Sequence, residues 1–181
     1  PGEPPDVELW EARLELARGE NVRAIKRLET SLDQDPSRSI VWTLLGFAYQ
    51  QSGDLYKAEE SLRKALELKP DQTRALRQLI QVSARRGLHH QTLQYLRRAL
   101  AFTPSDRRLL NTFLVYLDQH GSTDEALEVR LQLAGMHPDN YDNRRAIARL
   151  YLKARQPERA KAVLEKLLEE QPNDFRNVIA M

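Results

Sequence analysis

Residues 39–72, SIVWTLLGFAYQQSGDLYKAEESLRKALELKPDQ, contain the pattern that decides the fold. In the first half of this stretch, Trp42, Leu45 and Tyr49 recur at the three-to-four-residue spacing that marks one face of an α-helix. Gly53 interrupts the pattern, and apolar residues at helical spacing resume after it. The stretch therefore predicts a hairpin of two helices joined by a glycine turn.

The same unit recurs along the chain with a period of 34 residues. A proline closes each unit, because proline lacks an amide donor and clashes with the preceding helical turn. A glycine marks the turn of each unit except the fifth, where Arg155 takes its place. One hairpin cannot bury its apolar face alone, so neighbouring units are expected to stack into a continuous core. The prolines are Pro36, Pro70, Pro104, Pro138 and Pro172, and the glycines are Gly19, Gly53, Gly87 and Gly121.

The unit 39–72 resembles the tetratricopeptide repeat, whose period is also 34 residues. The later units keep the pattern more loosely. The resemblance implies an all-α, right-handed α-solenoid of about five helical hairpins that spans the chain as one array. The positions that match the pattern are Trp42, Leu45, Gly46, Tyr49, Ala58, Leu62, Ala65 and Pro70. The expected repeats are 5–38, 39–72, 73–106, 107–140 and 141–174.

The two ends of the predicted array depart from this pattern. In the first unit, the first helix has Glu8, Glu11 and Glu15 at the positions where the unit 39–72 has Trp42, Leu45 and Tyr49, and apolar residues follow one position later. This helix is either a degenerate end piece with an exposed face or a helix in a different register. Residues 175–181 are expected to begin a further repeat or a capping helix, as in a fragment of a longer array.

Composition limits the classes of function. The chain has 181 residues, 41% of them hydrophobic and 30% charged, as in an ordinary folded protein. It contains no cysteine, which excludes disulfides, thiolate metal sites and a cysteine nucleophile. A net charge of +2 does not indicate a polyanionic partner by itself. The longest uncharged stretch, 39–53, is too short and too polar to span a membrane. The localisation, cytoplasmic or periplasmic, stays open.

No group of residues indicates catalysis or a cofactor. The glycines form neither a dinucleotide-binding nor a phosphate-binding loop, and no zinc-protease or serine-hydrolase motif occurs. His89 and His90 are adjacent, so on a helix they point about 100° apart instead of toward one metal ion. We therefore expect no enzyme activity, no cofactor and no metal site.

The resemblance also implies a binding face. In tetratricopeptide repeats, positions 2, 5, 9, 12 and 13 of the first helix of each unit line a concave groove. In the third to fifth units these positions hold seven basic and two acidic residues, so the groove is expected to be basic and to bind an acidic segment of a partner protein. Phe47 is the expected apolar anchor. The expected partner-binding residues are Thr43, Phe47, Gln50, Arg74, Arg77, Gln81, Arg85, Arg108, Asn111, Arg145, Arg149 and Lys153.

Other functions remain open from the sequence. Repeat arrays also stack on themselves through open ends, which makes self-assembly or organisation of a complex one alternative. An anionic polysaccharide such as an exopolysaccharide is another, since it requires only basic residues. Nucleic acid is not expected, because it favours regularly spaced aromatic residues and the groove positions of the second to fifth units offer Phe47 alone. Chaperone-binding members of the family have a set of Lys, Asn and Arg residues, the carboxylate clamp, across three successive repeats. This chain lacks that set whether the clamp is aligned from the first, the second or the third unit. The leading expectation is a non-catalytic scaffold or adaptor.

Overall fold

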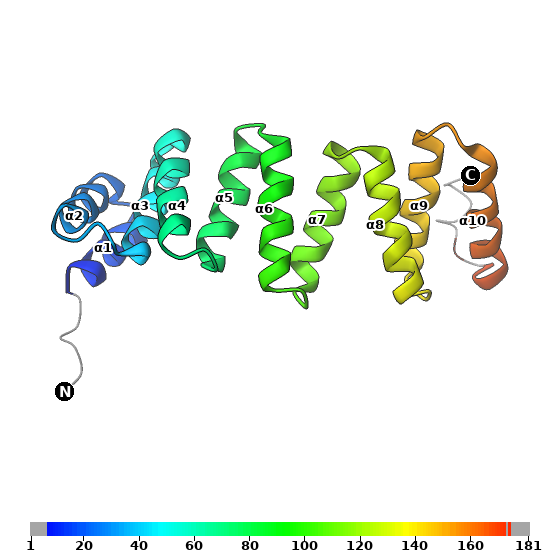
Figure 1. The fold of residues 1–181 in the computed structure, drawn as a ribbon, viewed down its shortest axis with the longest axis horizontal. Coiled ribbons are helices and arrows are strands. Elements are labelled where there is room, and N and C mark those ends of the chain that lie inside the picture. Colours follow the sequence, from blue (N-terminus) through cyan, green and yellow to red (C-terminus); the bar gives the residue numbers. More distant parts are fainter. Residues whose placement is uncertain (1–6, 173, 175–181) are drawn as a thin grey trace. The chain divides into compact units, whose positions relative to one another are not determined.

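The regular secondary structure of the chain is helical throughout residues 7–172 and 174, the part that this computed structural model describes (Figure 1). That part contains ten α-helices and no strand, which confirms the expected all-α helical-repeat solenoid. The tail 175–181, expected to begin another repeat or a cap, lies outside the described residues. The helices are α1 (Val7–Ala17), α2 (Asn21–Gln34), α3 (Ser39–Ser52), α4 (Leu55–Leu68), α5 (Thr73–Arg85), α6 (His89–Phe102), α7 (Arg107–His120), α8 (Thr123–Met136), α9 (Tyr141–Lys153) and α10 (Pro157–Glu170).

The hairpin of α3 and α4 shows why this sequence forms paired helices. Val41 and Leu44 on α3, and Ala58 and Leu62 on α4, are buried almost completely. Burying a side chain of the size of valine or leucine contributes about 1.5–3 kcal/mol relative to leaving it in water. Since these residues recur at helical spacing, each helix presents a continuous apolar stripe to its partner.

The turn of this hairpin depends on two adjacent residues. Gly53 has a φ of 91°, in the left-handed region that a residue without a Cβ adopts readily. Asp54 then caps α4, because its side chain accepts a hydrogen bond from the N–H of Lys57 at 3.0 Å. Arg155, in the position of the fifth glycine, has a φ of 58°, whereas Gly121 has no positive φ.

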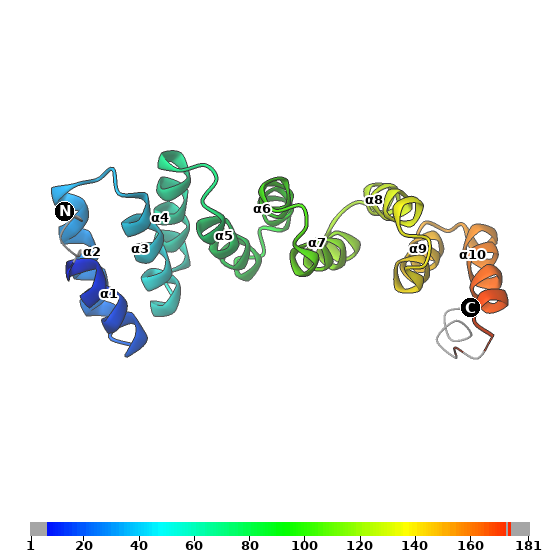
Figure 2. The ribbon, with the colours of Figure 1, turned by 90° about the horizontal axis from the view of Figure 1, so that it is seen from below.

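The chain forms two compact units, residues 1–109 and 110–181. In the first unit, α3 contacts α1 and α5 in addition to α2 and α4, so α1, α3 and α5 form one layer. In the second unit, α9 packs against both α8 and α10 (Figure 2). None of the described helices is both long enough and apolar enough to cross a bilayer.

Candidate functional site

The first unit has a hollow over the layer that α1, α3 and α5 form. Its volume is about 460 Å³. Each of the three helices contributes to its lining, so the hollow depends on the packing of neighbouring hairpins and not on one hairpin alone. The lining residues are Arg13, Leu16 and Ala17 of α1, Leu44 and Phe47 of α3, and Arg74 of α5.

Two guanidinium groups flank the apolar floor of this hollow. Arg74 is exposed, and no carboxylate among the described residues lies within 4.0 Å of its guanidinium group. Arg13 lies 5.9 Å from the centre of the Trp10 ring, and its buried Nε has no hydrogen-bond partner in the described part of the chain. The hollow therefore combines apolar surface with positive charge that the described residues do not neutralise.

Three more of the expected residues meet beside Phe47, where α3 and α5 adjoin. Gln50 donates a hydrogen bond from Nε2 to Oε1 of Gln81 at 3.1 Å. Arg85 is exposed, and its guanidinium group approaches the Gln50 carbonyl oxygen at 3.5 Å. This pairing leaves amide groups at the surface that can hydrogen-bond to a peptide backbone.

α1 contributes Arg13 to this hollow and a buried residue to the core of the first hairpin. Arg13 and Phe47, one period apart, line the same hollow, and Ala12, just before Arg13, is completely buried. Glu15 of α1 is ion-paired with Arg27 of α2 at 2.9 Å, so the acidic side chains find a partner within the first hairpin.

Sequence reasoning missed Arg13, Leu16 and Ala17 as lining residues. The glutamates of α1 interrupt the apolar pattern there, so the resemblance gives groove positions only for the later units. The signal was present in the spacing, since Arg13 precedes Phe47 by one full period and Phe47 was already the expected anchor.

Two expected contact residues are buried, and the expectation for them is corrected. Thr43 has no exposed surface, and its hydroxyl donates to the Ser39 carbonyl oxygen at 3.0 Å within α3. Arg145 is 7% exposed and is ion-paired with Asp142 at 2.5 Å and with Asp174 at 3.1 Å. Because buried charges persist when they are paired, Arg145 is held by the fold and does not present its charge to a partner.

Arg77 reaches the surface with its charge compensated. Its guanidinium group pairs with Asp106 at 2.6 Å. The pKa of Asp106 lies below its ordinary value because its carboxylate accepts the backbone hydrogen bond of Leu109, and because Arg77 and the N–H of Arg108 also stabilise the charged form. Arg108 is exposed at the start of α7, next to this pair.

The second unit exposes Asn111 of α7 and two of the expected basic residues of α9. Arg149 has no carboxylate within 4.0 Å among the described residues. Lys153 donates from Nζ to the Asp118 carbonyl oxygen at 3.1 Å and keeps its side chain at the surface. This unit therefore has its own small basic surface.

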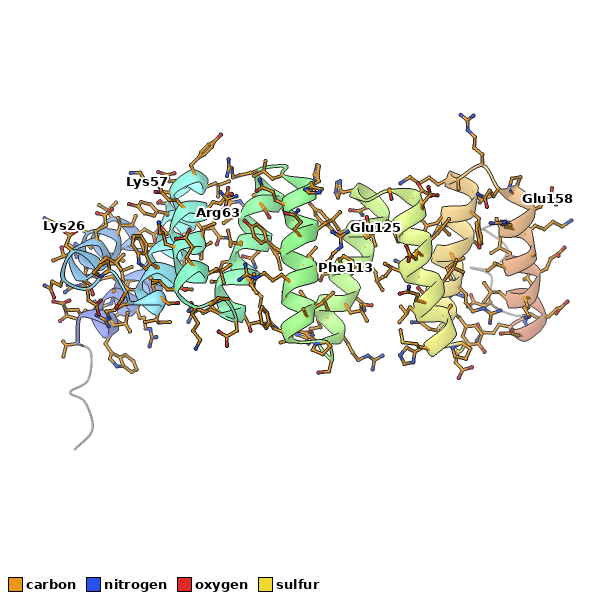
Figure 3. All side chains as sticks on the ribbon, viewed as in Figure 1. Lys26, Lys57, Arg63, Phe113, Glu125 and Glu158 are labelled. Atoms are coloured by element: carbon orange, nitrogen blue, oxygen red, sulfur yellow. The ribbon has the colours of Figure 1, made fainter. Side chains whose placement is uncertain are left out.

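A contrasting hollow of about 390 Å³ lies between α4 and α6. Arg63, marked in Figure 3, contributes to it together with Glu59, Glu60 and Glu67. Glu59 is buried and ion-paired with both Arg63 and Arg86. Because acidic and basic groups compensate each other here, this hollow lacks the excess of positive charge found beside Phe47. Among the residues described, no three His, Asp or Glu side chains come together in a way that could hold a metal ion.

Comparison with known proteins matches this architecture. A family model described as tetratricopeptide repeat matches residues 15–81 and 117–181, most of the chain. The chain is similar to YrrB, a TPR protein with an unusual peptide-binding site, with a TM-score of 0.68 and 22% identity over 98% of this chain and 91% of that one. It is also similar to MamA from Desulfovibrio magneticus RS-1, with a TM-score of 0.64 and 18% identity over 96% and 98% of the two chains. The first TPR of Spaghetti, bound to the HSP90 peptide SRMEEVD, has a TM-score of 0.59 and 18% identity over 64% of this chain and 94% of that one.

Proposed function

Because the chain belongs to the tetratricopeptide repeat family and has the fold of a protein–protein interaction scaffold, we propose that it is a non-catalytic adaptor that binds an acidic peptide segment of a partner protein. The proposed site is the hollow lined by α1, α3 and α5. Two proteins of the same fold bind peptides: YrrB has a peptide-binding site, and Spaghetti binds SRMEEVD, a sequence with three acidic residues.

The observation that carries this proposal is the pair of guanidinium groups beside an apolar floor. Arg13 and Arg74 lie on helices that flank α3, and Phe47 lies between them on the floor of the hollow. A guanidinium group binds a carboxylate through two parallel hydrogen bonds, so each arginine can hold one acidic side chain in a fixed orientation. An apolar side chain of the peptide packs on Phe47, where burial of aromatic surface contributes most to affinity.

The remaining expected residues extend this proposal. In the first unit, Gln50 and Gln81 hydrogen-bond to the peptide backbone, and Arg85 adds positive charge beside them. Arg77, which is paired with Asp106, and Arg108 lie near the starts of α5 and α7. In the second unit, Asn111, Arg149 and Lys153 provide a separate contact surface.

Fluorescence anisotropy tests the site with a fluorescein-labelled peptide that has one leucine between two pairs of glutamates. We expect Arg74→Glu to weaken binding at least tenfold, since it replaces attraction of a carboxylate by repulsion. Lys64→Glu is the matched control, because Lys64 lies on α4 away from the hollow and the substitution changes the charge equally. We expect Lys64→Glu to retain the affinity of the parent chain within a factor of two.

A peptide with glutamines in place of the glutamates separates charge from apolar packing. If the partner segment is acidic, the glutamine peptide should bind more weakly than the glutamate peptide. Arg74→Glu should then change the affinity for the glutamine peptide only slightly. Equal affinity for the two peptides would contradict the acidic partner. Binding of polyglucuronate, with neither peptide retained, would assign the basic surface to an anionic polysaccharide instead.

A further inference from the structure

The first helix exposes an apolar stripe on the surface of the first unit. Val7, Trp10 and Leu14 are 59%, 65% and 50% exposed, and their spacing of three and four residues places them on one face of α1. The residues that follow these three by one 34-residue period lie on α3 and are all buried between helices. The same face of the first helix therefore packs against other helices in the second repeat. Those buried residues are Val41, Leu44 and Ala48.

The second unit contains an apolar cleft of about 480 Å³, formed by α8, α9 and α10. Its wall includes Leu131, which is 45% exposed, together with Tyr151 and Val163. Arg144 occupies the repeat position that Trp42 fills in the second repeat, and it points its charge to Glu170, with which it pairs at 2.5 Å. Arg144 also lines the cleft.

We propose that α1 of one copy of this chain docks its apolar stripe into the cleft between α8, α9 and α10 of a second copy. Trp10 and Leu14 lie one helical turn apart, and two such side chains suit a cleft whose volume falls in the range of about 300–1,000 Å³ typical of binding pockets. An amphipathic helix entering a groove with anchors at this spacing is a common mode of recognition.

Charge complementarity supports the second copy as the occupant. Glu8 is exposed beside the stripe on α1. At the cleft, Lys166 of α10 is exposed, and no carboxylate in the described part of the chain lies within 4.0 Å of its Nζ. The contact joins different surfaces of the two copies, so it is heterologous and can continue from copy to copy as a linear assembly.

Sedimentation velocity of the full 181-residue chain over a series of concentrations tests this assembly. We expect the parent chain to sediment faster as its concentration rises. Trp10→Glu and Leu131→Glu each place a charge in the contact and should keep the chain monomeric at tenfold higher concentration. Leu68→Glu is the matched control, since Leu68 on α4 is also 45% exposed but lies outside both surfaces, and it should behave as the parent chain. Circular dichroism of every variant verifies that helix content is retained.

A mixing experiment distinguishes the proposed contact from other kinds of association. The Trp10→Glu chain keeps an intact cleft, and the Leu131→Glu chain keeps an intact α1. An equimolar mixture should therefore form dimers but no larger species. A mixture that stays monomeric, or a parent chain that stays monomeric throughout, would overturn the proposal. Arg74→Glu should assemble as the parent chain does, which separates this contact from the peptide site.

Discussion

At the scale of single residues, Arg155 holds the turn between α9 and α10 in an unfavourable backbone conformation. Its φ is 58°, in the region that Gly19, Gly53 and Gly87 occupy in the earlier repeats. The left-handed conformation costs an ordinary residue about 1–2 kcal/mol, because Cβ crowds the following carbonyl oxygen. The turn is nevertheless formed, with the N–H of Gln156 donating to the Tyr151 carbonyl oxygen at 2.8 Å.

Replacing this residue by glycine should stabilise the second unit. We expect Arg155→Gly to raise the free energy of unfolding by about 1 kcal/mol, since the steric cost at Cβ disappears. Urea denaturation followed by circular dichroism measures the change. Arg155→Ala retains Cβ and should leave stability nearly unchanged, so equal gains in the two variants would attribute the effect to the side chain instead of the backbone.

Another single residue, Asp106, makes the folding stability of the chain depend on pH. Its Oδ1 accepts hydrogen bonds from the N–H groups of Arg108 and Leu109, both at 3.1 Å, and its pKa lies below the ordinary value of 3.8. A carboxyl with a lower pKa in the folded state stabilises the fold above the unfolded-state pKa. That contribution is lost as the pH falls through the folded-state value.

We therefore expect Asp106→Asn to lower the melting temperature at pH 7. The difference from the parent chain should shrink as the pH falls below 3.8, where the unfolded carboxyl takes up a proton, and its charge-dependent part should be gone below the folded-state pKa, where the folded carboxyl is neutral as well. Calorimetry at a series of pH values measures this convergence. Asp71→Asn, at an exposed position before α5, serves as the control. A difference that stays constant down to pH 2 would contradict the assigned role of the charge.

At the scale of helices, Arg130 joins three elements of the second unit. The residue is 6% exposed, and its guanidinium group binds both carboxylate oxygens of Asp118 on α7, at 2.8 and 2.6 Å. It also donates to Oδ1 of Asn143 on α9 at 2.9 Å, and Asn143 donates back to the Arg130 carbonyl oxygen at 2.9 Å. These hydrogen bonds and ion pairs compensate the buried charge of Arg130. They join α8 to its neighbours at a place where an apolar contact could otherwise do so.

Removal of this charge should destabilise the unit strongly. We expect Arg130→Met to lower the free energy of unfolding by about 3 kcal/mol, because Asn143 and Asp118 lose their partner in a largely buried site. Chemical denaturation measures the loss. Arg159→Met, at an exposed position of α10, should change stability by less than about 0.5 kcal/mol. A loss equal to that of the control would show that the network contributes nothing to stability.

At the scale of the whole molecule, stability is expected to be local. Hairpins in a repeat array contact only their neighbours, so a defect in one repeat affects distant repeats weakly. The described part of this chain divides into two compact units, one up to residue 109 and one from residue 110.

Hydrogen exchange of the Arg130→Met chain tests this locality. We expect faster amide exchange in α8 and α9, where the network is lost, and unchanged exchange in α3 and α4 of the first unit. Mass spectrometry of peptic fragments resolves these segments. Equal acceleration in both units would show instead that they unfold as a single cooperative structure.

The sequence by itself determined the helical repeat of this protein. Hairpins depend on local signals: apolar residues at helical spacing, the proline that closes each unit and the residue that forms each turn. These signals lie within 34 residues of one another, so they can be counted along the chain. Phe47 and Arg74, two of the residues expected to bind a partner, line one hollow, and their role in binding stays a prediction.

Only the tertiary structure decided which basic residues keep their charge available. Arg77 is paired with Asp106 and Arg145 with Asp174, and the members of each pair lie 29 residues apart in the sequence. The periodicity marks positions on a helix face but does not say which side chain the next hairpin brings against them. Arg13 lines the hollow, whereas Thr43 is buried and does not. The sequence does not show this, because burial and ion pairing depend on how neighbouring hairpins pack.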